Sequence, residues 1–207
     1  MQTKQSVYMH GSREHIIKKA TALFLQKSFK AVTMKEIVES TGLSKGAFYH
    51  YFPSKESLFL EIVETYIRML NIDFDKFSKN SLYEFYHNYI DSSYKKFMQL
   101  KEFLEDTNDE DDLTYITLTF DAINLFPGFK EQVRQLHNRE LSAWENVIQL
   151  AMERGEIKSS MTPVQIASLF VYVSDGIGQR LLMQGQIGDL QDELLILWNG
   201  LYNDLKV

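Results

Sequence analysis

The sequence contains no cysteine, and it has only 3 prolines and 10 glycines in 207 residues. The lack of cysteine excludes disulfides, thiolate catalysis and cysteine-ligated zinc or iron–sulfur sites. The scarcity of proline and glycine permits long helices. A long apolar run is missing as well, because the longest uncharged stretch, residues 159–174, is shorter than the ~20 apolar residues that span a membrane. The first residues also lack the apolar core of a signal peptide, so we expect a soluble, cytoplasmic protein with no membrane partner.

Negative charge is unevenly distributed along the chain. The net charge of −6 argues against a general nucleic-acid binder. Residues 1–60, however, contain nine Lys/Arg and four Asp/Glu, which gives +5, whereas residues 61–207 contain thirteen and twenty-four, which gives −11. A basic N-terminal part on an acidic body favours DNA binding at one end of the protein.

A stretch that begins at Thr33 predicts two short helices joined by a tight turn. Thr33 and Glu36 have the spacing of a capping box at the start of the first helix. Gly42 suits the left-handed conformation that ends a helix, and Ser44 is a suitable N-cap for a second helix over residues 45–51. A helix, a tight glycine turn and a short helix form the helix-turn-helix motif, whose second helix enters the DNA major groove.

The residue types on the second helix support this interpretation. Phe48 and Phe52 are four residues apart and share the face that we expect to be buried. Lys45, Tyr49 and His50 fall on other faces, where they suit contacts to phosphates and base edges.

The string GLSKGAFYHYFPSKESLF, together with its flanking helices, resembles the signature of the tetracycline-repressor (TetR) family of bacterial transcription regulators. The resemblance covers residues 10–60. It implies an operator-DNA partner, a small-molecule inducer bound in the body, and a homodimer that pairs through the last two long helices. The DNA-contacting positions that it implies are Thr33, Lys45, Gly46, Ala47, Tyr49, His50 and Lys55. Among them, Thr33 and the backbone amide near Lys55 are expected to hold phosphates.

The apolar periodicity of the whole chain predicts an all-α protein with nine helices in a TetR-like architecture. Besides the two short helices, the expected long helices include residues 12–28, 54–77, 81–104, 112–125, 128–154, 163–184 and 189–205. We expect a DNA-binding domain over residues 1–55 and a ligand-binding and dimerisation domain over residues 56–207. The acidic run 105–112 is interpreted as a solvated loop and helix start; a metal site is the alternative, but the run lacks the spacing of a calcium-binding loop.

The body is rich in aromatic residues, which predict either a ligand cavity or an ordinary core. The candidates for a cavity lining are Tyr66, Phe85, Tyr89, Phe97, Tyr115, Phe120, Trp144 and Phe170. The many tyrosines favour a cavity as a set, since a buried hydroxyl needs a partner. For any single residue, however, a place in the core is the plainer interpretation.

The last two helices predict a dimer interface. Their apolar residues exceed what one helix at the edge of a body buries within its own chain, and a two-fold four-helix bundle would cover them. The residues expected at this interface are Val173, Ile177, Leu181, Leu194, Leu197, Trp198 and Leu201. Two ordinary core helices are the alternative.

The sequence therefore predicts a ligand-responsive, homodimeric DNA-binding regulator, a repressor released from an inverted-repeat operator by a small apolar or aromatic molecule. No paired histidines, phosphate loop or dinucleotide fingerprint is present, so we expect no metal, no cofactor and no enzymatic activity. One rival is a DNA-binding structural or division factor that responds to no ligand. A second rival, an enzyme that uses the aromatic cavity, has no support in the sequence.

Overall fold

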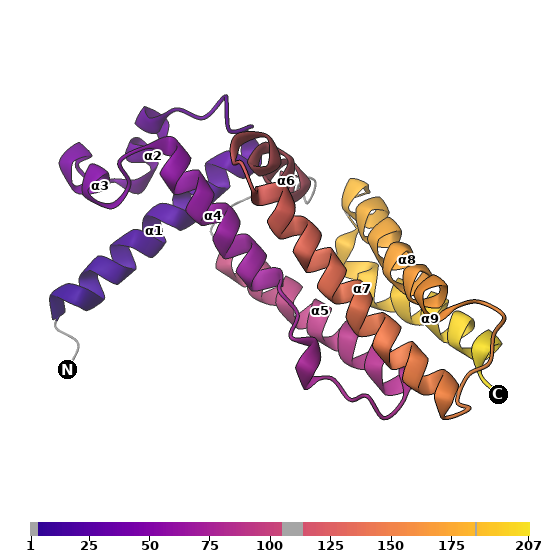
Figure 1. Cartoon of the computed structure of the whole chain (residues 1–207). Helices are drawn as coiled ribbons and strands as arrows, with labels where there is room; N and C mark the ends of the chain where they lie inside the picture. The colour runs from indigo at the N-terminus through magenta and orange to yellow at the C-terminus, as the bar shows by residue number, and fades with distance from the viewer. Residues whose placement is uncertain (1–3, 105–113, 185) are drawn as a thin grey trace. The chain divides into compact units, whose positions relative to one another are not determined.

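The protein is described by a computed structural model that covers residues 4–104, 114–184 and 186–207. Over these residues it is all-helical, with nine α-helices and two short 3-10 helices (Figure 1). The elements are α1 (Lys4–Gln26), α2 (Met34–Thr41), α3 (Lys45–Tyr51), α4 (Lys55–Leu70), η1 (Phe74–Lys76), α5 (Leu82–Leu104), α6 (Thr114–Leu125), α7 (Phe129–Glu153), α8 (Pro163–Met183), η2 (Ile187–Asp189) and α9 (Leu190–Leu205). The predicted helical fold is confirmed.

Most helix ends agree with the sequence prediction, but α1 begins at Lys4 and not at residue 12, and α4 is shorter than expected. It ends at Leu70 and not near Phe77, and η1 follows within an extended connection. Phe74 and Phe77 continue the apolar pattern, yet they pack on one another with ring centroids 5.6 Å apart outside any α-helix. At the other end of the chain, Asp189 stands before α9 as expected but makes no side-chain capping bond.

The chain forms two compact units, each of which combines two separate segments. Unit 1 comprises the described residues of Met1–Met69 and Gln99–Phe129, and unit 2 comprises those of Leu70–Met98 and Lys130–Val207. The functional boundary after residue 55 stays a prediction.

The core of unit 1 is an aromatic and aliphatic cluster beneath the helix-turn-helix. Phe24 and Phe59 are buried, and their ring centroids are 4.9 Å apart. Phe29 lies 4.8 Å from Phe59, and Phe126, just after α6, stacks on Phe59 at 6.2 Å. The helix-turn-helix is therefore supported by α1, α4 and the end of α6 through one continuous set of rings.

The core of unit 2 is dominated by large aromatic side chains. Trp144 on α7 and Trp198 on α9 are fully buried with centroids 5.1 Å apart. Phe170 on α8 stacks on Trp144 at 4.8 Å, and Phe85 on α5 meets the same ring edge-on at 5.0 Å. The core thus joins α5, α7, α8 and α9, of which α8 and α9 lie side by side (Figure 1).

One carboxylate joins the start of α5 to the end of α9. Glu156 accepts hydrogen bonds from the backbone N–H groups of Leu82 and Tyr83 and from the hydroxyl of Tyr202. The two N–H groups lie at a helix N-terminus, where they have no partner within the helix. The backbone beside it forms a bridge between Ile157 and Lys206. These contacts fix both helix ends within unit 2.

Candidate DNA-binding interface

The helix-turn-helix is held by local capping bonds, as predicted. The hydroxyl of Thr33 accepts a 3.2 Å bond from the backbone N–H of Glu36, whose carboxylate in turn accepts a 2.8 Å bond from the Thr33 N–H. Gly42 adopts a φ of 67°, a left-handed conformation that side chains resist, and ends α2. Ser44 then caps α3 by accepting a bond from the Ala47 N–H. These local bonds set where α3 begins.

The capping box also has an electrostatic consequence. The hydrogen bond from Lys27, followed by those from Thr33, lowers the pKa of Glu36 from 4.5 to about 2. Glu36 is therefore ionised at neutral pH, as the reciprocal cap requires. The Thr33 hydroxyl also donates a 2.8 Å bond to this carboxylate, so its proton is engaged within the protein.

The α3 helix buries one face and exposes the other. Phe48 is 0% exposed and lies 6.4 Å from Phe52, which is also buried. The remaining residues that the sequence analysis singled out on α3, namely Lys45, Gly46, Ala47, Tyr49 and His50, are exposed. The ammonium of Lys45 lies 5.9 Å from the centre of the Tyr49 ring. The structure thus brings five of the seven predicted DNA-contacting residues together on one short exposed helix.

Gly46 leaves free space on this surface. A Cβ atom built at this position meets nothing within 4 Å in the protein. The fold therefore does not require glycine at this position. A glycine there does allow a ligand to approach the helix backbone closely.

Lys55 has a role that the sequence did not reveal. Its ammonium donates bonds of 2.8 Å and 2.7 Å to the carbonyl oxygens of Phe29 and Val32. Because Val32 is fully buried and Phe29 nearly so, the side chain of Lys55 supports the turn between α1 and α2. The proposed phosphate contact of its backbone amide stays a prediction.

A second long-range hydrogen bond joins the same turn to α6. The backbone N–H of Phe29 donates a 2.9 Å bond to the carboxylate of Asp121. Asp121 and Lys55 thus bind the two backbone polar groups of Phe29, Asp121 at its N–H and Lys55 at its carbonyl oxygen. No local sequence pattern identifies either residue, because both partners are distant in the chain.

The predicted pocket residues fall into different environments. Phe85, Trp144 and Phe170 are fully buried and fill the core of unit 2. The hydroxyl of Tyr89 donates a 2.6 Å bond to Glu140, and burial raises the pKa of both groups. Phe97 lines a small cavity between α5 and α9.

The other three predicted pocket residues belong to unit 1. Burial raises the pKa of Tyr66, on α4, to about 12. Phe120, on α6, is 60% exposed. The side chain of Tyr115 lies outside the described residues, as does the whole acidic run 105–112. A ligand cavity formed by the aromatic set stays a prediction.

The predicted interface residues are divided between core and surface. Leu194 and Trp198 are buried in the core of their own unit, and Leu181 is only 7% exposed, so these three side chains are already covered without a partner. Val173, Ile177 and Leu201 are partly buried against the same core. Leu197 is 47% exposed, and other exposed apolar residues of α8 and α9 include Tyr172 at 63% and Ile196 at 67%. The exposed apolar surface therefore contains residues that the sequence analysis did not select.

The described residues hold no group of three or more His, Asp or Glu side chains able to ligate a metal ion. Over the same part of the chain, no helix is long and apolar enough to cross a membrane.

The all-helical fold, the capped turn and the exposed α3 face together define a helix-turn-helix transcriptional regulator.

Comparison with known proteins gives the family. Residues 16–62 match the family described as "Bacterial regulatory proteins, tetR family". Over 171 residues the chain is 28% identical to the HTH-type transcriptional regulator YfiR of Bacillus subtilis, a match that covers 81% of this chain and 78% of YfiR. A second regulator of that organism, YerO, is 39% identical over 101 residues, which cover 46% of this chain but only 35% of YerO.

The fold is similar to solved structures over nearly the whole chain. A TetR transcriptional regulator from Chloroflexus aurantiacus J-10-FL superimposes with a TM-score of 0.61 at 20% identity and covers 95% of this chain and 94% of its own. A TetR-family regulator from Agrobacterium tumefaciens gives 0.58 at 14% identity, with 96% and 100% covered. The protein belongs to the TetR family of helix-turn-helix transcriptional regulators.

Proposed function

We propose that this regulator is a homodimeric repressor that binds an inverted-repeat operator through α3 and leaves it when a small molecule binds the body. The observation that carries DNA binding is the α3 surface, where Lys45, Tyr49 and His50 are exposed above a buried Phe48. These donors suit phosphates and base edges, and the small Gly46 lets the duplex come close to the helix.

Repression is supported by two relatives that each match part of the chain. The repressor NemR of Escherichia coli is 36% identical over 55 residues, which is 27% of this chain and 28% of NemR. The transcriptional repressor AcnR of Corynebacterium glutamicum is 35% identical over 75 residues, which is 36% of this chain and 38% of AcnR. The similarity to these two repressors thus covers only part of each protein, so repression remains part of our proposal.

Dimerisation is supported by exposed apolar side chains on α8 and α9. Leu169, Tyr172, Ile196 and Leu197 are 39%, 63%, 67% and 47% exposed, and we call this set the α8–α9 face. Large apolar side chains exposed on two adjacent helices are typical of an association surface. A two-fold axis at this face would present two α3 helices to two half-sites of an inverted repeat.

The test is binding of the full chain to the DNA that flanks its own gene, measured by gel shift across a salt series. We expect affinity to fall linearly and steeply on a log–log salt plot, since several phosphates are neutralised. A protein that binds no such segment more tightly than unrelated DNA would contradict the proposed function. Specific binding that no small molecule weakens would instead favour the ligand-independent DNA-binding factor.

A further inference from the structure

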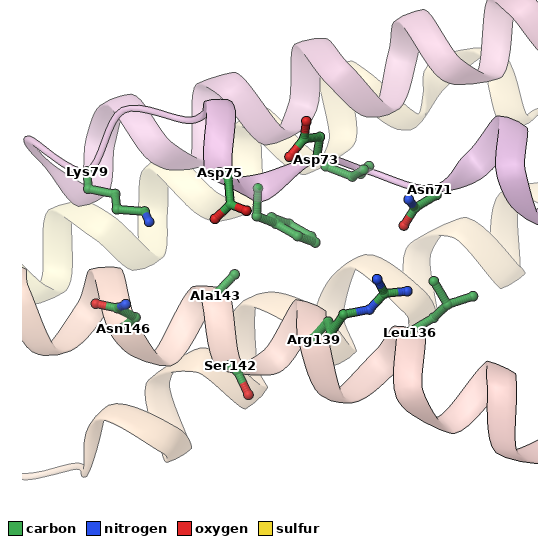
Figure 2. A pocket seen from close by; sticks show the side chains of 11 residues that line it. Asn71, Asp73, Asp75, Lys79, Leu136, Arg139, Ser142, Ala143 and Asn146 are labelled. Atoms are coloured by element: carbon green, nitrogen blue, oxygen red, sulfur yellow. The ribbon is translucent and has the colours of Figure 1, made fainter.

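A groove in unit 2 lies between the connection after α4 and one side of α7, with a volume of about 460 Å³ (Figure 2). One wall is the segment 71–79, which includes η1, and the other is a row of α7 residues spaced three or four apart, so that they share a face. The α7 residues are Leu136, Arg139, Ser142, Ala143 and Asn146. This volume lies in the range of about 300–1,000 Å³ that is typical of small-molecule sites.

The charged groups of the groove leave one guanidinium without a carboxylate. In Figure 2, Arg139 extends from α7 towards Asn71 on the opposite wall, and Lys79 and Asp75 lie at the other end. Asp73 is already paired with Lys76 at 3.0 Å. Among the residues that the structure describes, Arg139 has no ion pair, whereas Arg134 on the same helix forms bonds of 2.8 Å and 2.7 Å to Glu131.

The apolar part of the groove is fixed to the core of the unit. Phe74 lines the groove, and its ring lies 5.6 Å from Phe77, 6.4 Å from Phe85 and 6.3 Å from Tyr89. Ala143 on α7 offers a small apolar surface on the opposite wall. A flat or compact apolar body would therefore meet a preformed surface near a guanidinium.

We propose that this groove binds a small organic carboxylate with an apolar, ring-sized body, with the carboxylate on Arg139 and the body against Phe74. A guanidinium matches a carboxylate through two parallel hydrogen bonds. Lys76 neutralises Asp73. The other charged residues of the lining are Arg139, Lys79 and Asp75, which together have a net charge of +1. A monoanion balances this charge.

This inference rests on the proposed function, because it names the class of the ligand. Asn71 directly follows α4, whose Phe59 is buried in the core of unit 1. A ligand that binds against the segment 71–79 thus acts on the chain immediately beyond the helix that supports the DNA-binding motif. It changes operator affinity if it favours one arrangement of that connection over another.

The test uses the full-length protein and two probes, benzoate and hexanoate, in calorimetric titrations. We expect saturable binding of benzoate, and no binding of benzamide or benzylamine, which have the same ring without the negative charge. Arg139→Gln is expected to weaken benzoate binding by about tenfold or more, since it removes a charge-assisted pair. The matched control Arg134→Gln, on the same helix outside the groove, is expected to bind as wild type.

The proposal is overturned if neither carboxylate binds, if benzamide binds as well as benzoate, or if Arg139→Gln and Arg134→Gln behave alike. Gel shifts on the same preparations separate this result from the proposed function. Lack of operator binding by the ligand-free protein would overturn the proposed function and leave the benzoate titration valid. Normal operator binding by a protein that binds no carboxylate would overturn the groove alone.

Discussion

The ammonium of Lys55 lies 4.3 Å from the centre of the Phe29 ring and donates a 2.8 Å hydrogen bond to the carbonyl oxygen of the same residue. It also donates to the carbonyl of Val32. One side chain at the start of α4 thereby stabilises the turn that leads from α1 into α2.

Replacing Lys55 by methionine keeps most of the aliphatic stem and removes the donor. We expect Lys55→Met to lower the free energy of unfolding by about 2 kcal/mol, because partly buried carbonyl groups lose their partner. Chemical denaturation followed by circular dichroism measures this. Lys45→Met, on the exposed face of α3, is the control and is expected to change stability by less than about 0.5 kcal/mol. A Lys55→Met protein of normal stability that fails to bind DNA would instead indicate a direct contact.

A substitution at Gly46 is expected to affect stability and DNA binding in opposite directions. Since a Cβ there meets nothing within 4 Å, Gly46→Ala is expected to keep or raise stability, by up to about 1 kcal/mol from helix propensity. The methyl group nevertheless occupies the surface that we assign to the duplex, so operator affinity is expected to fall. Gly11→Ala in α1 is the control for the helical gain. Unchanged operator affinity in Gly46→Ala would show that the helix backbone is not approached closely.

Replacing each of two adjacent aromatic residues on α3 is expected to affect a different property, stability in one case and DNA binding in the other. Phe48→Ala removes a side chain that is 0% exposed and is expected to cost about 3–5 kcal/mol of stability. Tyr49→Ala removes a side chain that is 38% exposed and is expected to weaken specific binding by about 1–3 kcal/mol with the fold intact. Melting curves and gel shifts on the pair measure the two effects. Full operator affinity in Tyr49→Ala would remove this residue from the interface.

The α8–α9 face gives a test of dimerisation. Leu197 is 47% exposed, so Leu197→Glu is tolerated by the isolated unit but places a carboxylate in an apolar interface twice per dimer. We expect sedimentation to show a monomer with normal helix content and lost operator binding. Leu181 is unsuitable for this experiment, because it is only 7% exposed within its own unit. Met98→Glu, on the exposed surface of α5, is the control and is expected to stay dimeric.

Glu140 predicts a pH dependence of stability. Burial raises its pKa above 4.5, and Asp175 adds to this effect while Tyr89 and His137 oppose it. A carboxyl group with a raised pKa destabilises the folded state while it is ionised, and the penalty disappears as pH falls through the folded value towards 4.5. We therefore expect Glu140→Gln, which can still accept the Tyr89 hydrogen bond, to melt at a higher temperature than wild type at neutral pH and at the same temperature below 4.5. Glu145→Gln on the exposed side of α7 is the control; an equal gain there would contradict a role for burial.

The local features of the helix-turn-helix were predictable because each depends on residues close in sequence. Thr33 and Glu36 form the expected box, Gly42 adopts the left-handed turn, and Phe48 is buried. Thr162 and Gln165, three residues apart, form a similar reciprocal cap at the start of α8. Capping and periodicity are short-range effects, and a sequence records them directly.

The supports of the site were not predictable, because they join residues far apart in the chain. Asp121 bonds to a backbone group 92 residues away, and no local pattern specifies that partner. The groove was missed for a related reason. Apolar residues at Ile72, Phe74 and Phe77 extend the helical pattern past Leu70, while Asn71 and Asp73, which favour turns, end it. Packing of the Phe74 and Phe77 rings on Phe85 supplies the tertiary contacts that this choice requires.

The two tryptophans have a spectroscopic consequence. Trp144 and Trp198 are the only tryptophans in the sequence, and both are fully buried in the core of unit 2 with no hydrogen-bond partner for their indole N–H groups among the described residues. Intrinsic tryptophan fluorescence therefore reports the state of unit 2 alone, whereas circular dichroism reports the helices of both units. A denaturation curve recorded by both signals separates loss of the DNA-binding motif from loss of the body, with no label attached.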